Sequence, residues 1–304
     1  MRRPVDQFMR ELTEIADYRG KPFGRANLLF RAEDEHSQEI AKRFKGYLVL
    51  SDAFKCFYLE SVEVMNTQAR PKVKEQVSEF YGLLIPRLSN AFLALCGAER
   101  IAIKGYPYQG YTVLRNVYDN LVLTSAALQR ITDFYSIEGV RPEQVEYDPA
   151  AARKLRKAAE FAVRRQMTGD QSGLSPETRT EIDIWDSLFD LETHGGRLSA
   201  TNSMEWLRGQ GTLSVVPRFE ERGWVMYMNR FMEIAWMLHR LMPNIQPPAI
   251  PFEEPWPKKW KILDQSFSET VSALTEQRGK PIGDALVELV ERKFPFHPEL
   301  QFPL

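Results

Sequence analysis

One histidine lies in a setting that could support chemistry. His194 follows an acidic segment that contains a tryptophan and precedes Gly195, Gly196 and Arg197. Two consecutive glycines would let the backbone approach a ligand closely and present N–H groups to an anion, and the arginine would add positive charge. The alternative is structural. A histidine in the last turn of a helix interacts favourably with the carbonyl end, and the following glycine ends the helix.

A second group of polar residues interrupts an apolar segment. Arg115 and Asp119 are one helical turn apart and can face each other, with Asn116 next to the arginine. A charge inside a buried helix is costly unless it is paired. The pair must therefore lie at a cleft, at a subunit interface or in a mutual salt bridge; an exposed edge of the fold is the alternative. His194, Arg115, Asp119 and Arg197 are the catalytic candidates.

A basic stripe is the third candidate. Arg153, Lys157 and Arg164 fall on one face of a predicted helix, which Glu160 alone interrupts. Such a stripe could hold phosphate groups, with Asn116 as a further binding candidate. The alternative is a solvated helix face. It agrees with the formal net charge of −1, which provides no global field to attract nucleic acid or an anionic membrane.

Strong motifs for cofactor or metal chemistry are absent from the sequence. It contains no phosphate-binding loop, no G-x-G-x-x-G, no H-E-x-x-H, no C-x-x-C and no G-x-S-x-G. We therefore expect no cofactor and no metal site. Cys56 and Cys96 lie in apolar helical patterns and are expected to be buried, reduced thiols. His239 lies in an apolar segment and is expected in the core or at an interface.

Helices are the elements that must position these residues. Apolar residues recur at three-to-four spacing over 36–65, where we expect one long helix, and again over 73–102, where Pro86 should kink or split the helix. The segments 108–131 and 224–242 are apolar on nearly all sides, which predicts two helices in the middle of a bundle. The fold class is thus all-α, a multi-helix bundle.

The remaining segments complete this organisation. We expect helices at about 4–18, at 149–167 behind Asp148, and at 175–194, with one extended segment at 211–219. The bundle comprises residues 1–243, with core helices at about 36–131 and 149–243. A Pro-rich strap follows at 244–257, and then a small C-terminal helical extension at 258–304, with helices at 258–277 and 281–293. Its aromatic residues predict that it packs back on the bundle.

The N-terminal region and the absence of long apolar runs bear on the compartment. Charged residues follow the first four positions at once, which is unlike a secretory signal, and nowhere do 18 apolar residues run together. We expect a cytoplasmic protein with no membrane segment.

Part of the chain resembles the HEPN-like superfamily. The segment 105–121 carries glycines, then Leu114-Arg115, and Asp119 one turn later, like a helix of that superfamily. The segment 185–197, with Thr193-His194, is similar to its Ser-x-x-x-His region, and 224–242 to its closing core helix. The resemblance covers about residues 105–243. It implies a helical bundle, often dimeric, that in some members cleaves RNA without a metal ion. There, an arginine and a histidine face the scissile phosphate across the dimer.

The Arg-then-His signature of those nucleases, with four to six residues between the two, has two literal matches. Arg292 and His297 are separated by Pro295, which prevents a regular helical pair. Arg31 and His36 enclose three carboxylates, which would repel an RNA phosphate. The chain departs from the family pattern at this point, so the catalytic assignment rests on His194 instead.

Two functional hypotheses follow. One is a metal-independent ribonuclease or toxin-like effector of a bacterial stress or phage-defence system, with histidine as general acid or base and RNA as ligand. The other is a non-catalytic helical interaction or sensor subunit that binds a protein partner. Six tryptophans, eighteen phenylalanines and ten methionines favour it by offering apolar contact surface. The expected partner is a second copy of the chain, forming a dimer, or another protein; RNA is a further possible ligand, and no membrane is expected.

Overall fold

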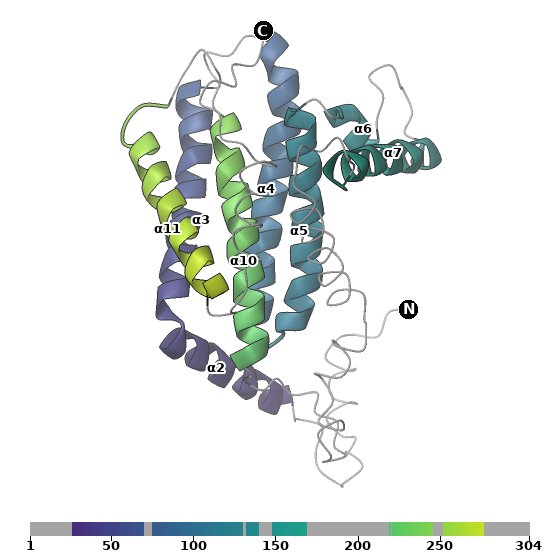
Figure 1. Cartoon of the computed structure of the whole chain (residues 1–304). Coiled ribbons are helices and arrows are strands. Elements are labelled where there is room, and N and C mark those ends of the chain that lie inside the picture. Colours follow the sequence, from purple (N-terminus) through teal and green to yellow (C-terminus); the bar gives the residue numbers. More distant parts are fainter. Residues whose placement is uncertain are drawn as a thin grey trace, which may run out of the picture.

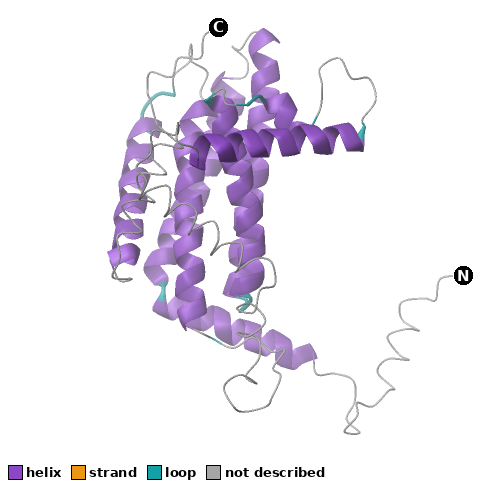
Figure 2. Ribbon diagram, turned by 45° about the vertical axis from the view of Figure 1, so that its right-hand side comes forward, coloured by secondary structure: helices purple, strands orange, loops and turns teal. Residues whose placement is uncertain are grey.

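The structure, a computed structural model, is helical in all its regular elements. It describes residues 26–69, 75–129, 132–139, 148–168, 219, 221–245 and 252–276. Within these ranges four long helices run side by side (Figures 1 and 2): α3 (Lys45–Val64), α4 (Glu75–Ile103), α5 (Pro107–Leu128) and α10 (Glu221–Leu241). The predicted all-α bundle is confirmed.

The other described helices surround this bundle. α2 (Ala26–Arg43) crosses one end of it, and α11 (Trp256–Glu276) packs on α3 and α10. The short α6 (Phe134–Glu138) leads toward α7 (Pro149–Thr168), which lies crosswise to the bundle and extends away from its side (Figures 1 and 2). The expected helices at 4–18, 175–194 and 281–293 lie outside the described residues. So does the extended segment at 211–219, apart from Phe219, which is not in a strand.

Burial on all sides makes α10 the central helix. Every side chain from 227 to 239 is buried, and Phe231 is fully inaccessible. α3, α4, α5 and α11 all contact it, and aromatic pairs such as Tyr47–Phe231 (5.6 Å between ring centroids) and Tyr111–Tyr227 (5.9 Å) fix the contacts. Aromatic pairs of this kind add roughly 0.5–1.5 kcal/mol each beyond area burial. The sequence prediction for 224–242 is confirmed.

For α5 the same prediction is wrong in part. Leu114 and Leu121 are fully buried, but the side chains of Thr112, Asn116 and Asp119 are exposed on the opposite side. Three polar positions at three-to-four spacing form one narrow face along the helix. The helix therefore lies at the side of the bundle, with a polar strip toward solvent.

The single long helix expected over 36–65 is also wrong. The chain is already helical from Ala26, and it bends at Phe44, where φ is −120° and ψ is 37°. The Phe44 ring packs on Trp224 (5.9 Å between centroids), and Gly46, a weak helix former, follows. Phe44 thus packs on α10 and does not have helical backbone angles. Because the helix is interrupted at this residue, α2 and α3 point in different directions.

Pro86 does not split α4, which is helical from Glu75 to Ile103. A proline cannot donate a hydrogen bond to the carbonyl group four residues earlier, here that of Gly82. Both residues are exposed, so water can hydrogen-bond to this carbonyl group.

Reciprocal contacts between a histidine and a tryptophan join α10 to α11. His239 Nε2 donates to the carbonyl oxygen of Trp260 (3.0 Å), Trp260 Nε1 donates to the carbonyl oxygen of His239 (3.1 Å), and the rings stack with centroids 5.1 Å apart. Burial lowers the pKa of His239 to about 3, so this core histidine is neutral at physiological pH. The expectation that His239 lies in the core is confirmed.

A glycine sets the distance between α5 and its neighbours. A Cβ atom at Gly110 would lie 2.7 Å from Tyr227 Cε2 on α10 and 3.1 Å from the carbonyl oxygen of Ala98 on α4. Both separations are shorter than ordinary contacts between nonbonded atoms. The three helices can approach this closely only because residue 110 has no side chain.

We therefore predict that Gly110→Ala lowers the free energy of unfolding by about 1–3 kcal/mol, because α5 must move away from α10 and α4. Gly97→Ala on α4 is the matched control, since its Cβ would meet nothing within 4 Å. The control should be neutral or more stable by roughly 0.5–1 kcal/mol, since alanine favours a helix over glycine. Urea denaturation followed by circular dichroism measures both. Equal stability of the two variants would contradict this account of the helix spacing.

Candidate functional site

The predicted pairing of Arg115 and Asp119 on α5 is confirmed. Arg115 Nε donates to Asp119 Oδ2 at 3.1 Å, and the guanidinium lies over the Tyr118 ring, 5.5 Å from its centroid. The arginine side chain is 18% exposed and the aspartate 49%, so the pair lies at the edge of the bundle as a mutual salt bridge. The exposed Asn116 follows on the same polar strip. The carboxylate neutralises the guanidinium, and the pair alone therefore offers little net attraction to an anion.

The other two catalytic candidates, His194 and Arg197, lie outside the described residues. Where their side chains lie relative to Arg115 is therefore not part of the structure. Arg164, the third member of the predicted basic stripe, belongs to α7, but its side chain is outside the described set as well.

α7 begins as the sequence predicts. Asp148 caps it by accepting hydrogen bonds from the backbone N–H groups of Ala150 (2.9 Å) and Ala151 (3.3 Å), and Pro149 occupies the first turn. The contact face of α7 consists of small side chains, since Ala152, Ala159 and Val163 are buried. These residues share one side of the helix.

A close contact with α6 holds the start of α7. Gly139 ends α6 with φ of +70°, and a Cβ atom there would lie 2.7 Å from the carbonyl oxygen of Ala152 and 2.9 Å from its Cα. A left-handed conformation and so short an approach both require glycine. The backbone of α7 is thus pressed directly against the end of α6.

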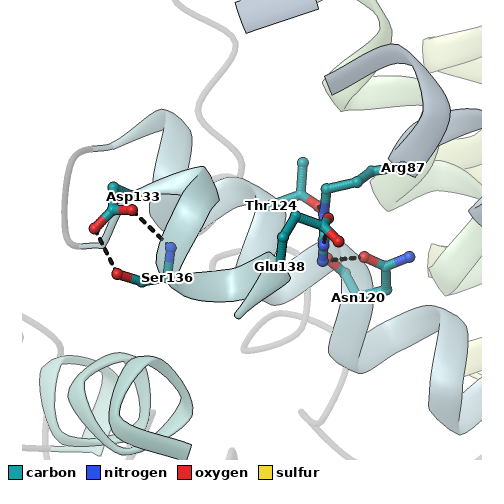
Figure 3. A network of polar contacts seen from close by, with 6 residues as sticks. All are labelled: Arg87, Asn120, Thr124, Asp133, Ser136 and Glu138. Carbon is teal, nitrogen blue, oxygen red and sulfur yellow. Dashed lines mark hydrogen bonds and ion pairs between the residues drawn. The ribbon is translucent and has the colours of Figure 1, made fainter. Parts of the chain in front are cut away.

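A partly buried arginine in turn fixes α6 to the bundle (Figure 3). Arg87 on α4 donates through Nε to Thr124 Oγ1 (3.2 Å) and through its two terminal nitrogens to Asn120 on α5 and Glu138 on α6. Asp133 caps α6 by accepting from Ser136 N and Oγ, both at 2.7 Å. One guanidinium thus joins three helices and supports the base of α7.

Exposed cations cover the side of α7 that faces away from these contacts. Arg153 and Lys157, two of the three predicted stripe residues, are exposed, and so is Lys154. Arg156 is exposed as well, but it lies one turn after Ala152, beside the contact face. No ion pair with another described residue engages Arg153, Lys154 or Lys157. Their positive charge therefore faces solvent without a fixed counter-charge in the described part of the chain.

An ion pair between a buried carboxylate and a partly exposed lysine was not predicted. Glu99 on α4 is 2% exposed and pairs with Lys55 of α3, which also reaches the exposed Asp52 at 3.1 Å. Burial raises the pKa of Tyr47 and of Tyr227 well above the usual range, and the nearby charge of Glu99 raises both further. The sequence did carry a signal, because Glu99 falls within the apolar stripe of α4, between Leu95 and Ala102.

His36, from the Arg31–His36 match to the nuclease signature, has a structural role. It is 4% exposed, its Nδ1 is 2.9 Å from the carbonyl oxygen of Ile103, and its ring packs on Phe219 with centroids 5.6 Å apart. Burial lowers its pKa. His36 therefore helps to hold α2 against the end of α4. The second match, Arg292 and His297, lies outside the described residues.

The expectation for the cysteines is wrong for Cys56, whose side chain is exposed, while that of Cys96 is partly buried. Cys56 lies on the opposite side of α3 from Phe54, Phe57 and Tyr58, which are buried. The apolar neighbours in the sequence belong to the core face, and the cysteine between them does not.

Two further observations concern the described residues only. No three histidine, cysteine, aspartate or glutamate side chains among them are grouped so that they could hold a metal ion. None of the described helices combines the length and the apolar composition needed to cross a bilayer.

Comparison with known proteins adds no relative, since no family model, no curated protein and no solved structure matches the chain. A function must therefore be argued from the surfaces themselves. Two of them differ chemically: the neutral strip of α5 around Arg115 and the cationic side of α7.

The Lys55–Glu99 pair yields a prediction about stability. In Lys55→Met the side-chain stem remains but the charge is lost, which leaves the Glu99 carboxylate buried without its cation. We expect the free energy of unfolding to fall by about 3 kcal/mol. Adding Glu99→Gln to this variant should restore part of the loss, because no uncompensated charge then remains.

Asp52→Asn is the matched control. It removes the exposed partner of the same lysine, whose aspartate side chain is 72% exposed, and should change stability by no more than about 0.5 kcal/mol. Thermal and urea unfolding measure all three variants. A Lys55→Met protein as stable as the wild type would show that the buried pair does not hold the interior together.

Proposed function

We propose that this chain is a helical RNA-binding protein, HEPN-like in its fold, whose helix α7 binds the phosphate backbone of RNA. The observation that carries the proposal is the cationic side of α7. Arg153, Lys154 and Lys157 are exposed on this side, and Glu160 is the one carboxylate between Arg153 and Val163, although the whole chain has a net charge of −1. A local cationic surface on a nearly neutral protein is what phosphate recognition requires.

The position of α7 supports this role. The helix extends away from the bundle (Figure 2). Its small contact residues are buried, whereas Arg153, Lys154 and Lys157 are exposed. Among the described helices, none therefore stands between a polyanion and Arg153, Lys154 and Lys157. Arg115 and Asn116 on α5 would make secondary contacts.

Cleavage of the bound RNA is the second half of the proposal and is supported by the resemblance to metal-independent nucleases. His194 would act as general acid or base on the 2′-hydroxyl group, and Arg115 and Arg197 would stabilise charge on the phosphate. Asp119 would hold the Arg115 guanidinium in place through the hydrogen bond to Nε. A nuclease of this kind fits a bacterial stress or phage-defence effector.

Binding can be tested with a fluorescently labelled 20-nucleotide RNA and anisotropy titrations at several salt concentrations. We expect the double variant Arg153→Gln with Lys157→Gln to bind at least tenfold more weakly. The slope of log K against log salt should become shallower by about 1.4, since each phosphate contact on a single strand contributes about 0.7.

The matched control for this test is the double variant Lys258→Gln with Lys261→Gln. It removes two exposed cations from α11 and should bind like the wild type. An equal loss of affinity in both variants would mean that RNA responds to overall charge and not to α7.

Cleavage is tested separately by incubating the labelled RNA with the protein in EDTA. The wild type should produce fragments, and His194→Ala should not. If the wild type leaves the RNA intact, or if the variant cleaves equally well, the catalytic half of the proposal is rejected. The binding half stands or falls on the titrations alone.

Exposed apolar side chains favour a second candidate, a non-catalytic subunit that binds a protein partner or a second copy. Val49 and Leu59 on α3 are each 60% exposed, and Leu93 on α4 is 64% exposed. Protein interfaces use such side chains. Size-exclusion chromatography with light scattering, followed by pull-down, tests this candidate. If it is correct, the protein forms a stable oligomer or retains a partner. A monomer without a retained partner would reject it.

A further inference from the structure

An aromatic side chain lies on the cationic side of α7, one turn beyond the last of the described cations. Phe161 is 70% exposed, more than any other large apolar side chain that the structure describes as exposed. It lies between Ala159 and Val163, two residues from each. Two residues correspond to a rotation of about 200° around a helix, so Phe161 points away from the side that packs on the bundle.

Cations precede this phenylalanine on the outward side of the helix. Lys157 precedes it by one turn, and Lys154 and Arg153 precede it by about two turns. All three are exposed, as Phe161 is. An outward ring beside side chains that can hold a phosphate backbone is the combination by which proteins bind unpaired nucleotides: the cations follow the backbone, and the bases stack on the ring.

We propose that Phe161 stacks on an unpaired base, so that α7 selects single-stranded over double-stranded RNA. The inference rests on the proposed RNA binding and adds the form of RNA that is bound. In a duplex the faces of the bases are covered by their neighbours, and a side chain can reach only backbone, 2′-hydroxyl groups and groove edges. In a single strand a base can turn outward and cover the ring.

A membrane surface fits this helix less well. A helix that lies in a bilayer interface needs a broad apolar face to bury among the lipids. The apolar residues Ala152, Ala159 and Val163 are already buried against the protein, and the outward side offers one phenylalanine among cations. Attraction to lipid headgroups would therefore lack the apolar contact that such helices require.

The test compares one labelled 12-nucleotide RNA, alone and annealed to its complement, by anisotropy. The wild type should bind the single strand more tightly than the duplex. Phe161→Ala should weaken single-strand binding roughly tenfold, a typical effect of losing one base–aromatic stack, and leave duplex binding unchanged. Phe161→Trp should bind the single strand at least as well as the wild type.

Two controls separate stacking from general stickiness. Phe161→Leu keeps an apolar side chain without a ring and should behave like Phe161→Ala. Phe30→Ala removes another exposed phenylalanine, 56% accessible on α2 and next to acidic residues, and should have no effect on RNA binding. A 2-aminopurine placed in the strand should lose fluorescence on binding the wild type and keep it with Phe161→Ala.

The outcomes distinguish this inference from the function on which it rests. If Phe161→Leu binds like the wild type, or if duplex and single strand lose affinity equally, stacking is refuted, while loss of binding in the Arg153 and Lys157 double variant still supports RNA binding. If the wild type binds neither RNA, both proposals fail. If the protein does not bind RNA but sediments with phosphatidylserine-containing vesicles, and if Phe161→Ala abolishes this sedimentation, the surface binds membranes instead.

Discussion

The burial of α10 on every side from 227 to 239 is the constraint on which the rest of the fold depends. A helix with no side toward solvent needs a neighbour on every side, and α3, α4, α5 and α11 fill these places. Its polar residues must then find partners inside the protein. Arg230 pairs with Glu233 at 3.2 Å, and His239 exchanges hydrogen bonds with Trp260. α11 thus supplies hydrogen-bond partners for a buried polar residue of α10.

In the described part of the chain, the residues that pack the core lie apart from the polar residues that could bind a ligand. Around α10 the interior is occupied by aromatic rings and by ion pairs, among them Arg230 with Glu233 and Lys55 with Glu99. Groups that could meet a large ligand lie instead on elements at the periphery: the polar strip of α5 and the outward side of α7. Arg87 links the two, because it joins α4 to both α5 and α6.

Periodicity predicted the helices well, because the apolar stripe of a helix is a local property of the sequence. The ends of α7 and α10 came within a few residues, and the cap at Asp148 and the pairing of Arg115 with Asp119 follow from spacing alone. The bend at Phe44 could not be predicted in this way, since a contact with Trp224, far away in the sequence, sets it.

The candidate site was less predictable than the fold. Spacing placed Arg153 and Lys157 on one side of α7, but only the packing of Ala152, Ala159 and Val163 shows that this side points outward. Phe161 had no distinguishing mark in the sequence, because an apolar residue in a helix is usually a core residue. The place of Glu99 in an apolar stripe does mark it in the sequence. Its partner Lys55 could not be predicted in the same way, because it comes from another helix.

The division of α7 into two independent sides has a consequence for how such a protein can diverge. Its attachment to the described bundle depends on small side chains and on Gly139, whereas Arg153, Lys154, Lys157 and Phe161 are exposed. Substitutions on the outer side can therefore accumulate without destabilising the fold. Proteins that share this fold could therefore differ in the ligand that they bind through a few amino-acid substitutions within three helical turns.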